Sequence, residues 1–114
     1  MRIAVVTTVS LALLSPAAGA ATRWYWPLMK VMRAVDGARV RVGARVVRID
    51  AESTLCSGEG RAVRRRGVRM WSRFSCTFTT FTSKGVDRDL DFDVYVTGRN
   101  RYVIRDAHWI GATR

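Results

Sequence analysis

Apolar residues recur with a helical period in one segment near the start of the chain, residues 27–37. The apolar positions i, i+3, i+4 and i+7 are Leu28, Val31, Met32 and Val35. This spacing predicts one amphipathic helix of about ten residues. Pro27 suits the first helical position and Gly37 supplies the C-terminal stop. A helix this short is marginal alone, so its apolar stripe must pack on another element. The preceding aromatic residues, Trp24, Tyr25 and Trp26, are expected to hold the start of this helix or to join the core, and a ligand cage is the alternative.

After Gly37 the apolar period becomes two, as in β-strands. The alternation changes phase at Gly43, which predicts a short strand at 38–42 and a second strand from 45 into 56, because glycine tolerates a turn or bulge. A third strand is expected at 69–81, with Met70, Phe74, Cys76 and Phe78 on one face.

The last two strands flank a hairpin turn predicted at residues 97–100. In the strand before it, four alternate residues point inward and the aspartates between them point outward; the inward residues are Leu90, Phe92, Val94 and Val96. In the closing strand the inward set is ambiguous, because either Tyr102 with Ile104 or Val103 with Trp109 fits. The predicted fold is α+β, with one N-terminal amphipathic helix packed on a four- to five-stranded antiparallel meander sheet.

The first twenty residues resemble a signal peptide. Residues 3–14 are apolar and uncharged, Pro16 follows, and Ala18 and Ala20 flank a glycine in the pattern that a signal peptidase cleaves. The apolar run is too short to span a bilayer, although an uncleaved N-terminal anchor is the alternative. We therefore expect residues 1–20 to be removed and residues 21–114 to form a single secreted or extracytoplasmic domain without a transmembrane helix.

Export changes the meaning of the two cysteines. In an oxidising compartment, Cys56 and Cys76 are expected to form a disulfide. The loop of about 20 residues that it closes corresponds to a stabilisation of roughly 3 kcal/mol. Two cysteines and the single histidine are too few for a closed zinc site, so neither a metal nor another cofactor is expected.

The formal net charge is +11, and arginine supplies nearly all the positive charge. An aromatic residue, Trp71, lies within the densest basic cluster, which consists of Arg61, Arg64, Arg65, Arg66, Arg69 and Arg73. Arginine beside an aromatic ring suits binding of phosphate or another anion while a base or sugar stacks on the ring. The alternatives are a solvated hairpin loop, and an arginine content that reflects a GC-rich genome.

Two other groups of residues are candidates for chemistry. The aspartates at 87, 89, 91 and 93 lie about 6.8 Å apart along a strand, which suits a ladder facing arginines such as Arg73 better than a calcium site. His108 is the only histidine, and with Glu52 or Glu59 it gives the composition of a small basic ribonuclease without that family's local motifs. No catalytic residues are assigned.

A spaced set of residues carries a resemblance. Cys56-Ser57-Gly58, then Trp71-x-x-Phe74-x-Cys76, then a V-x-V-x-G strand end and a terminal aromatic strand resemble uncharacterised small secreted proteins of high-GC actinobacteria over residues 46–110. The resemblance implies a fold and export but no activity. The outline is also similar to cystatin-like and β-lactamase-inhibitor-like modules, at the level of fold only.

These observations favour an exported, non-enzymatic binding module that contacts an anionic polymer or a protein partner through the loop at 57–73. The sequence contains no specific nucleic-acid motif. One alternative is an inhibitor-like module that uses the sheet face with Asp89, Asp91, Asp93 and Tyr95. A ribonuclease-type hydrolase that uses His108 is the other alternative.

Overall fold

The computed structural model of the chain describes residues 23–82 and 85–110, so the expected signal peptide at 1–20 lies outside the described residues. Within this part the chain forms one α-helix, α2 (Leu28–Ala34), and a single turn of 3-10 helix, η2 (Ala51–Ser53). All strand pairings are antiparallel. Among the described residues, no helix is long and apolar enough to span a bilayer.

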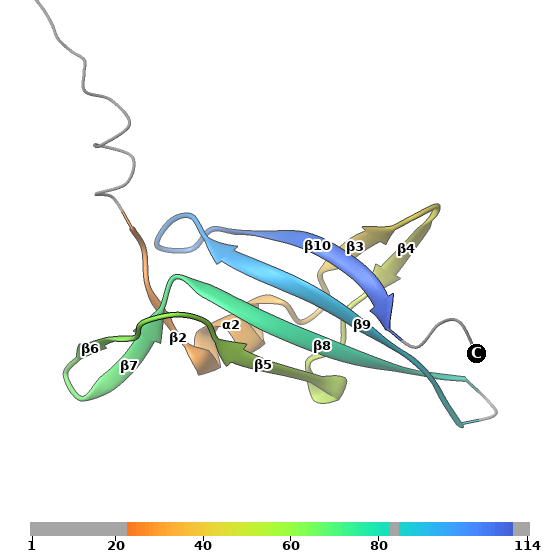
Figure 1. Cartoon of the computed structure of the whole chain (residues 1–114), viewed down its shortest axis with the longest axis horizontal. Coiled ribbons are helices and arrows are strands. Elements are labelled where there is room, and N and C mark those ends of the chain that lie inside the picture. Colours follow the sequence, from red (N-terminus) through yellow and green to blue (C-terminus); the bar gives the residue numbers. More distant parts are fainter. Residues whose placement is uncertain (1–22, 83–84, 111–114) are drawn as a thin grey trace, which may run out of the picture.

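The main sheet has four strands in the order β10-β9-β8-β5 (Figure 1). Their bounds are β5 (Thr54–Gly58), β8 (Arg73–Thr82), β9 (Gly85–Val96) and β10 (Tyr102–Ile110). The other strands form a three-stranded sheet of β2 (Trp26–Pro27), β7 (Val68–Trp71) and β6 (Val63–Arg65), and a two-stranded sheet of β3 (Arg39–Val42) and β4 (Arg45–Arg48). The prediction of mostly antiparallel sheet with one helix is confirmed, whereas a single meander of four to five strands is not.

Two interruptions of the expected strands explain the division into three sheets. The strand expected at 69–81 breaks at Ser72, whose carbonyl accepts a hydrogen bond from the Val96 amide at 2.9 Å. Met70 therefore belongs to β7 and Phe74 to β8, whereas the prediction placed both in one strand. The strand expected from 45 into 56 is interrupted by η2, where the Asp50 carboxylate accepts a hydrogen bond from the amide of Glu52 at 3.1 Å. Consequently β4 pairs with β3, and β5 pairs with β8.

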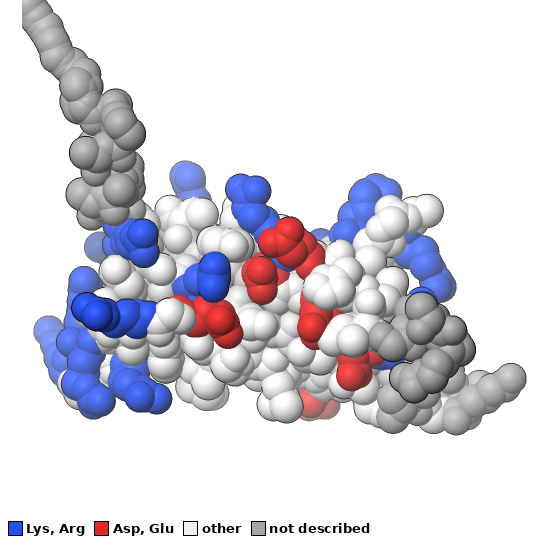
Figure 2. All heavy atoms as spheres, in the orientation of Figure 1, with Lys and Arg blue, Asp and Glu red and all other residues white. Residues whose placement is uncertain are grey.

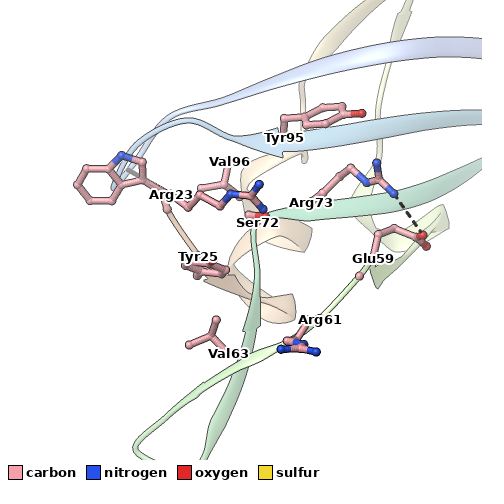
Figure 3. Close-up of a pocket in the computed structure, with 11 residues that line it drawn as sticks. Arg23, Tyr25, Glu59, Arg61, Val63, Ser72, Arg73, Tyr95 and Val96 are labelled. Atoms are coloured by element: carbon pink, nitrogen blue, oxygen red, sulfur yellow. Dashed lines mark ion pairs between the residues drawn. The ribbon is translucent and has the colours of Figure 1, made fainter. Parts of the chain in front are cut away.

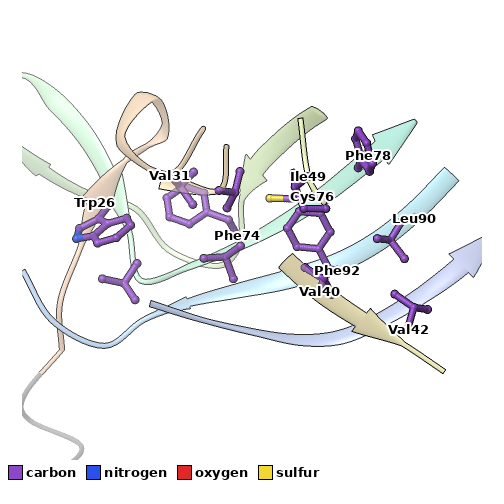
Figure 4. Packing of buried hydrophobic residues seen from close by; sticks show 13 residues of the cluster. Trp26, Val31, Val40, Val42, Ile49, Phe74, Cys76, Phe78, Leu90 and Phe92 are labelled. Carbon is purple, nitrogen blue, oxygen red and sulfur yellow. The ribbon is translucent and has the colours of Figure 1, made fainter. Parts of the chain in front are cut away.

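One face of the main sheet packs against α2 and β3 (Figures 1 and 4). The sheet contributes alternate residues of two neighbouring strands, which are Phe74, Cys76 and Phe78 from β8 and Leu90, Phe92, Val94 and Val96 from β9. Opposite them, α2 and the turn after it contribute Val31 and Val35, and β3 contributes Val40 and Val42. The apolar alternation of β9 is thus buried as predicted.

Strand β10 contains a bulge that accounts for its ambiguous pattern. The register with β9 shifts between Arg105 and His108, and Asp106 has a positive φ of 58°. Tyr102 and Ile104 pack against the core before the bulge, and Trp109 packs against it afterwards. An extra residue in one strand exchanges the two faces beyond it, so neither single alternation describes the whole strand.

The helix is tied to the turn between β9 and β10. The indole of Trp26 is 3% exposed, and its N–H donates to the carbonyl oxygens of Gly98 and Arg99 at 3.2 and 3.0 Å. The ammonium of Lys30 also donates to the Arg99 carbonyl, at 2.7 Å. Trp26 therefore belongs to the core, and these bonds fix the turn at the end of the sheet where the arginines gather.

Candidate anion-binding site

The disulfide predicted between Cys56 and Cys76 is present, and it joins β5 to β8 at directly opposed positions. The chain between the two cysteines leaves the main sheet and forms the β6–β7 hairpin. Its turn is Arg66-Gly67, with φ values of 52° and 79°, as a tight two-residue turn with positive φ at both positions requires. The disulfide thus closes the base of a loop that contains a second hairpin.

All six arginines of the predicted cluster are exposed, and most of them lie on this hairpin (Figure 2). Arg64 on β6 lies directly opposite Arg69 on β7. Like charges opposed across two strands destabilise the pairing. The Arg64 guanidinium donates to the Gly67 carbonyl at 3.3 Å, and that of Arg69 lies over a tryptophan ring. The cluster is completed by Arg61, before β6, and Arg73, the first residue of β8.

Trp71 fixes the hairpin to the main sheet. Its ring packs edge-on against Phe74, with ring centroids 5.9 Å apart, and the Arg69 guanidinium lies over it at 5.5 Å. The ring also covers Gly58, where a Cβ atom would overlap the indole. Trp71 is therefore a half-buried support for the arginines and not a free stacking surface.

At the base of the hairpin lies a hollow of about 660 Å³, a size typical of small-molecule sites (Figure 3). Its cationic lining consists of Arg23, Arg61 and Arg73, and the carboxylate in it is Glu59. The walls come from the segment before β2, the connection from β5 to β6, the junction of β7 with β8, and the end of β9. The lining therefore has a formal charge of +2.

Aromatic side chains complete the hollow, and sequence reasoning assigned them elsewhere. Trp24 and Tyr25 were expected to hold the helix start, and Tyr95 was assigned to the acidic sheet face, but all three line the hollow. The Arg73 guanidinium lies 5.9 Å from the Tyr95 ring centroid, and that of Arg65 lies 6.0 Å from the centroid of Tyr25. The sequence feature that could have indicated the hollow was the aromatic run next to Arg23, which was interpreted as holding the helix start.

Glu59 orients one of the cations. Its carboxylate lies 3.8 Å from the Arg73 guanidinium, and its amide donates to the Arg73 carbonyl at 2.9 Å (Figure 3). Both side chains are substantially exposed, so this ion pair adds at most about 1 kcal/mol to stability. Its main effect is to hold Arg73 between Glu59 and Tyr95, facing the hollow.

Two aspartates of the ladder have other partners than the predicted arginines, whereas Asp93 lies opposite Arg105 of β10. Thr77 and Thr79 of β8 donate hydroxyl hydrogen bonds to Asp91 and Asp89, at 2.7 and 2.9 Å. Arg73, the expected partner, lies opposite Tyr95 instead. Among the described residues, no group of three or more His, Cys, Asp or Glu side chains is placed to hold a metal ion.

Glu59 and His108, one of the two pairs of the ribonuclease hypothesis, are not brought together. Glu59 follows the end of β5, whereas His108 lies on β10 opposite Asp91, three strands away and four residues further along the sheet. Strand spacings of about 4.8 Å and residue rises of about 3.4 Å separate them by roughly 20 Å. The imidazole Nδ1 of His108 instead lies 2.8 Å from the Asp106 carbonyl.

The tryptophans do not gather on one face. Trp24 lines the hollow, whereas Trp109 lies on β10 and packs against the core with the Arg88 guanidinium 4.1 Å over its ring. Trp24 therefore lies with the arginines of the hollow, whereas Trp71 and Trp109 contact arginines outside it. No protein-family model, no curated protein and no solved structure matches this chain.

Proposed function

We propose that the chain is an exported, disulfide-bonded, non-enzymatic binding module that holds an anionic polymer along the β6–β7 hairpin and in the hollow at its base. The observation that carries the proposal is the joining of three arginines and three aromatic rings in one hollow, next to a hairpin whose turn and strands hold further arginines. The disulfide supports an oxidising location, because such bonds persist outside the reducing cytosol.

The two parts of the surface suit a polymer better than a single small anion. The hairpin presents Arg64, Arg65 and Arg66 to solvent without a carboxylate partner among the described residues, so it attracts a chain of charges over its length. The hollow adds rings on which one sugar or base can stack while Arg73 binds the neighbouring anionic group. Affinity should therefore fall steeply with salt.

Retention on a heparin column tests this proposal. The variant Arg64→Gln, Arg65→Gln, Arg66→Asn is expected to elute at clearly lower salt than the wild type. Asparagine is chosen at the turn because it tolerates the positive φ of that position. Arg73→Gln probes the hollow separately and should give a smaller shift in the same direction.

A control variant matches the loss of charge. It replaces three exposed arginines outside the hollow and the hairpin, which are Arg33, Arg99 and Arg101. If net charge alone governs retention, the control elutes with the hairpin variant, and the proposal is wrong. Wild-type elution of the hairpin variant contradicts it as well, provided that circular dichroism shows all variants folded.

A further inference from the structure

The β3–β4 hairpin carries a second arginine surface that the predicted site does not include. In this two-stranded sheet Arg39 lies directly opposite Arg48, and Arg41 lies opposite Val46. Residues opposed in an antiparallel pair share a face, and alternate residues along a strand share it too. One face therefore presents Arg39, Arg41 and Arg48, all exposed, while the other face buries Val40 and Val42 in the core.

Two arginines of this face, Arg39 and Arg41, line a second hollow beside the edge of the main sheet. It has a volume of about 590 Å³ and lies between β3 and β10, with Arg39, Arg41 and Arg105 as its cations and Asp106 as its acid. The Arg39 and Arg41 guanidinium groups have no hydrogen-bond or ion-pair partner among the residues that the structure describes. With three arginines and one aspartate, the lining has a formal charge of +2.

The opposed arginines repeat the arrangement of the first site. Arg39 and Arg48 are paired as Arg64 and Arg69 are on the β6–β7 hairpin. In both hairpins a like-charge pair weakens the strand pairing, and an anion held between the two side chains would offset that repulsion. Two hairpins with the same unfavourable pair, each beside a hollow lined by arginine, suggest the same kind of ligand.

We propose that the β3–β4 face and the hollow beside β10 form a second binding site for the anionic polymer. The two hairpins lie at different ends of the molecule, and carboxylates of the main sheet lie between them (Figures 1 and 2). On the face shown in Figure 2, a polyanion that crossed from one site to the other would pass these carboxylates. Each site therefore binds its own segment of polymer, and one protein molecule bridges two polymer molecules. This bridging rests on the proposed function of the first site.

Titration calorimetry with a heparin octasaccharide tests the second site. The wild type is expected to bind two fragments and the variant Arg39→Gln, Arg41→Gln, Arg48→Gln only one, with the remaining affinity close to that of the first site. The hairpin variant Arg64→Gln, Arg65→Gln, Arg66→Asn should also bind one fragment. The control variant of Arg33, Arg99 and Arg101 should still bind two.

The outcomes separate the two proposals. A wild type that binds one fragment, lost only in the β6–β7 variant, overturns the second site and leaves the first in place. A β6–β7 variant that still binds two fragments overturns the proposed function instead. Heparin-coated beads loaded with protein test bridging, because wild-type beads should capture fluorescent heparin from solution, whereas beads loaded with either site variant should lose that capture.

Discussion

At the scale of single residues, Gly58 and Trp71 explain a spaced motif whose purpose the sequence alone did not show. The glycine two residues after Cys56 lies under the indole of Trp71, and no side chain fits there. The same indole packs edge-on against Phe74, and the Arg69 guanidinium lies over its ring. The C-x-G and W-x-x-F-x-C patterns are therefore one packing unit that joins the β6–β7 hairpin to the main sheet.

Replacing Gly58 with alanine should destabilise the protein by about 1 to 3 kcal/mol, because the added methyl group overlaps the Trp71 ring. Urea unfolding followed by circular dichroism measures this loss. In a Trp71→Leu background the same substitution should cost less, since the smaller side chain leaves room for the methyl group. An equal cost in both backgrounds would show that the overlap is not its cause. Ser57→Ala, at the exposed neighbouring position, serves as the control.

Tyr102 is a second residue whose environment gives a measurable effect. Its hydroxyl donates to the Ala34 carbonyl at 3.0 Å, and burial raises the pKa of the phenol above its ordinary value of 10.0. The unfolded chain then releases this proton at lower pH than the folded chain. The stabilisation is therefore fully present below pH 10.0 and is lost as pH rises through the folded pKa.

Tyr102→Phe should lower the free energy of unfolding by about 1 kcal/mol at neutral pH, because the carbonyl of Ala34 loses its donor. The difference between wild type and variant should shrink as the pH is raised above 10.0. Urea unfolding of both proteins at a series of pH values measures it. A difference that stays constant across that range would mean that ionisation of Tyr102 is not linked to folding.

At the scale of elements, the success of a prediction depended on whether the strand was regular. In β9 the inward residues Leu90, Phe92 and Val94 are buried as the alternation predicted, because one face of that strand meets the core throughout. In β10 the alternation failed at the bulge, where Asp106 has a positive φ. The sequence shows the change of parity between Ile104 and Trp109, but the position of the bulge depends on pairing with β9.

The division of the strands among three sheets was not predictable for a related reason. Residues 69–81 were expected to form one strand, yet the chain bends at Ser72, where the carbonyl bonds to the Val96 amide. That bond joins residues far apart in the sequence and cannot be inferred from local periodicity. The same bend creates the corner that holds the first hollow, so the site depends on the least predictable feature of the fold.

At the scale of the whole molecule, positive and negative charges are segregated by element. Half of the arginines in the described residues lie on the β3–β4 and β6–β7 hairpins, which contain no acidic residue, whereas the aspartates of β9 lie on the main sheet. The sequence indicated this segregation for the cluster at 61–73, but it did not reveal Arg39, Arg41 and Arg48 as a shared face. The alternation in this segment was used only to predict which valines are buried. The arginines between those valines form the exposed second surface.

The disulfide determines whether this arrangement survives when the molecule is heated. Cys56 and Cys76 are 20 residues apart, and the loop that they close contains the whole β6–β7 hairpin. Closing such a loop lowers the entropy of the unfolded chain, which raises the free energy of unfolding by about 3 kcal/mol. Reduction should therefore lower Tm by roughly 12 to 24 °C. Scanning calorimetry with and without reductant measures this change, and the variant Cys56→Ala, Cys76→Ala, which does not respond to reductant, is the control.

Because the strand pairing that positions the arginines does not depend on the sulfur atoms, the reduced protein below its Tm should elute from heparin at nearly the same salt. Early elution of the reduced, still folded protein would show instead that the disulfide positions the binding surface directly.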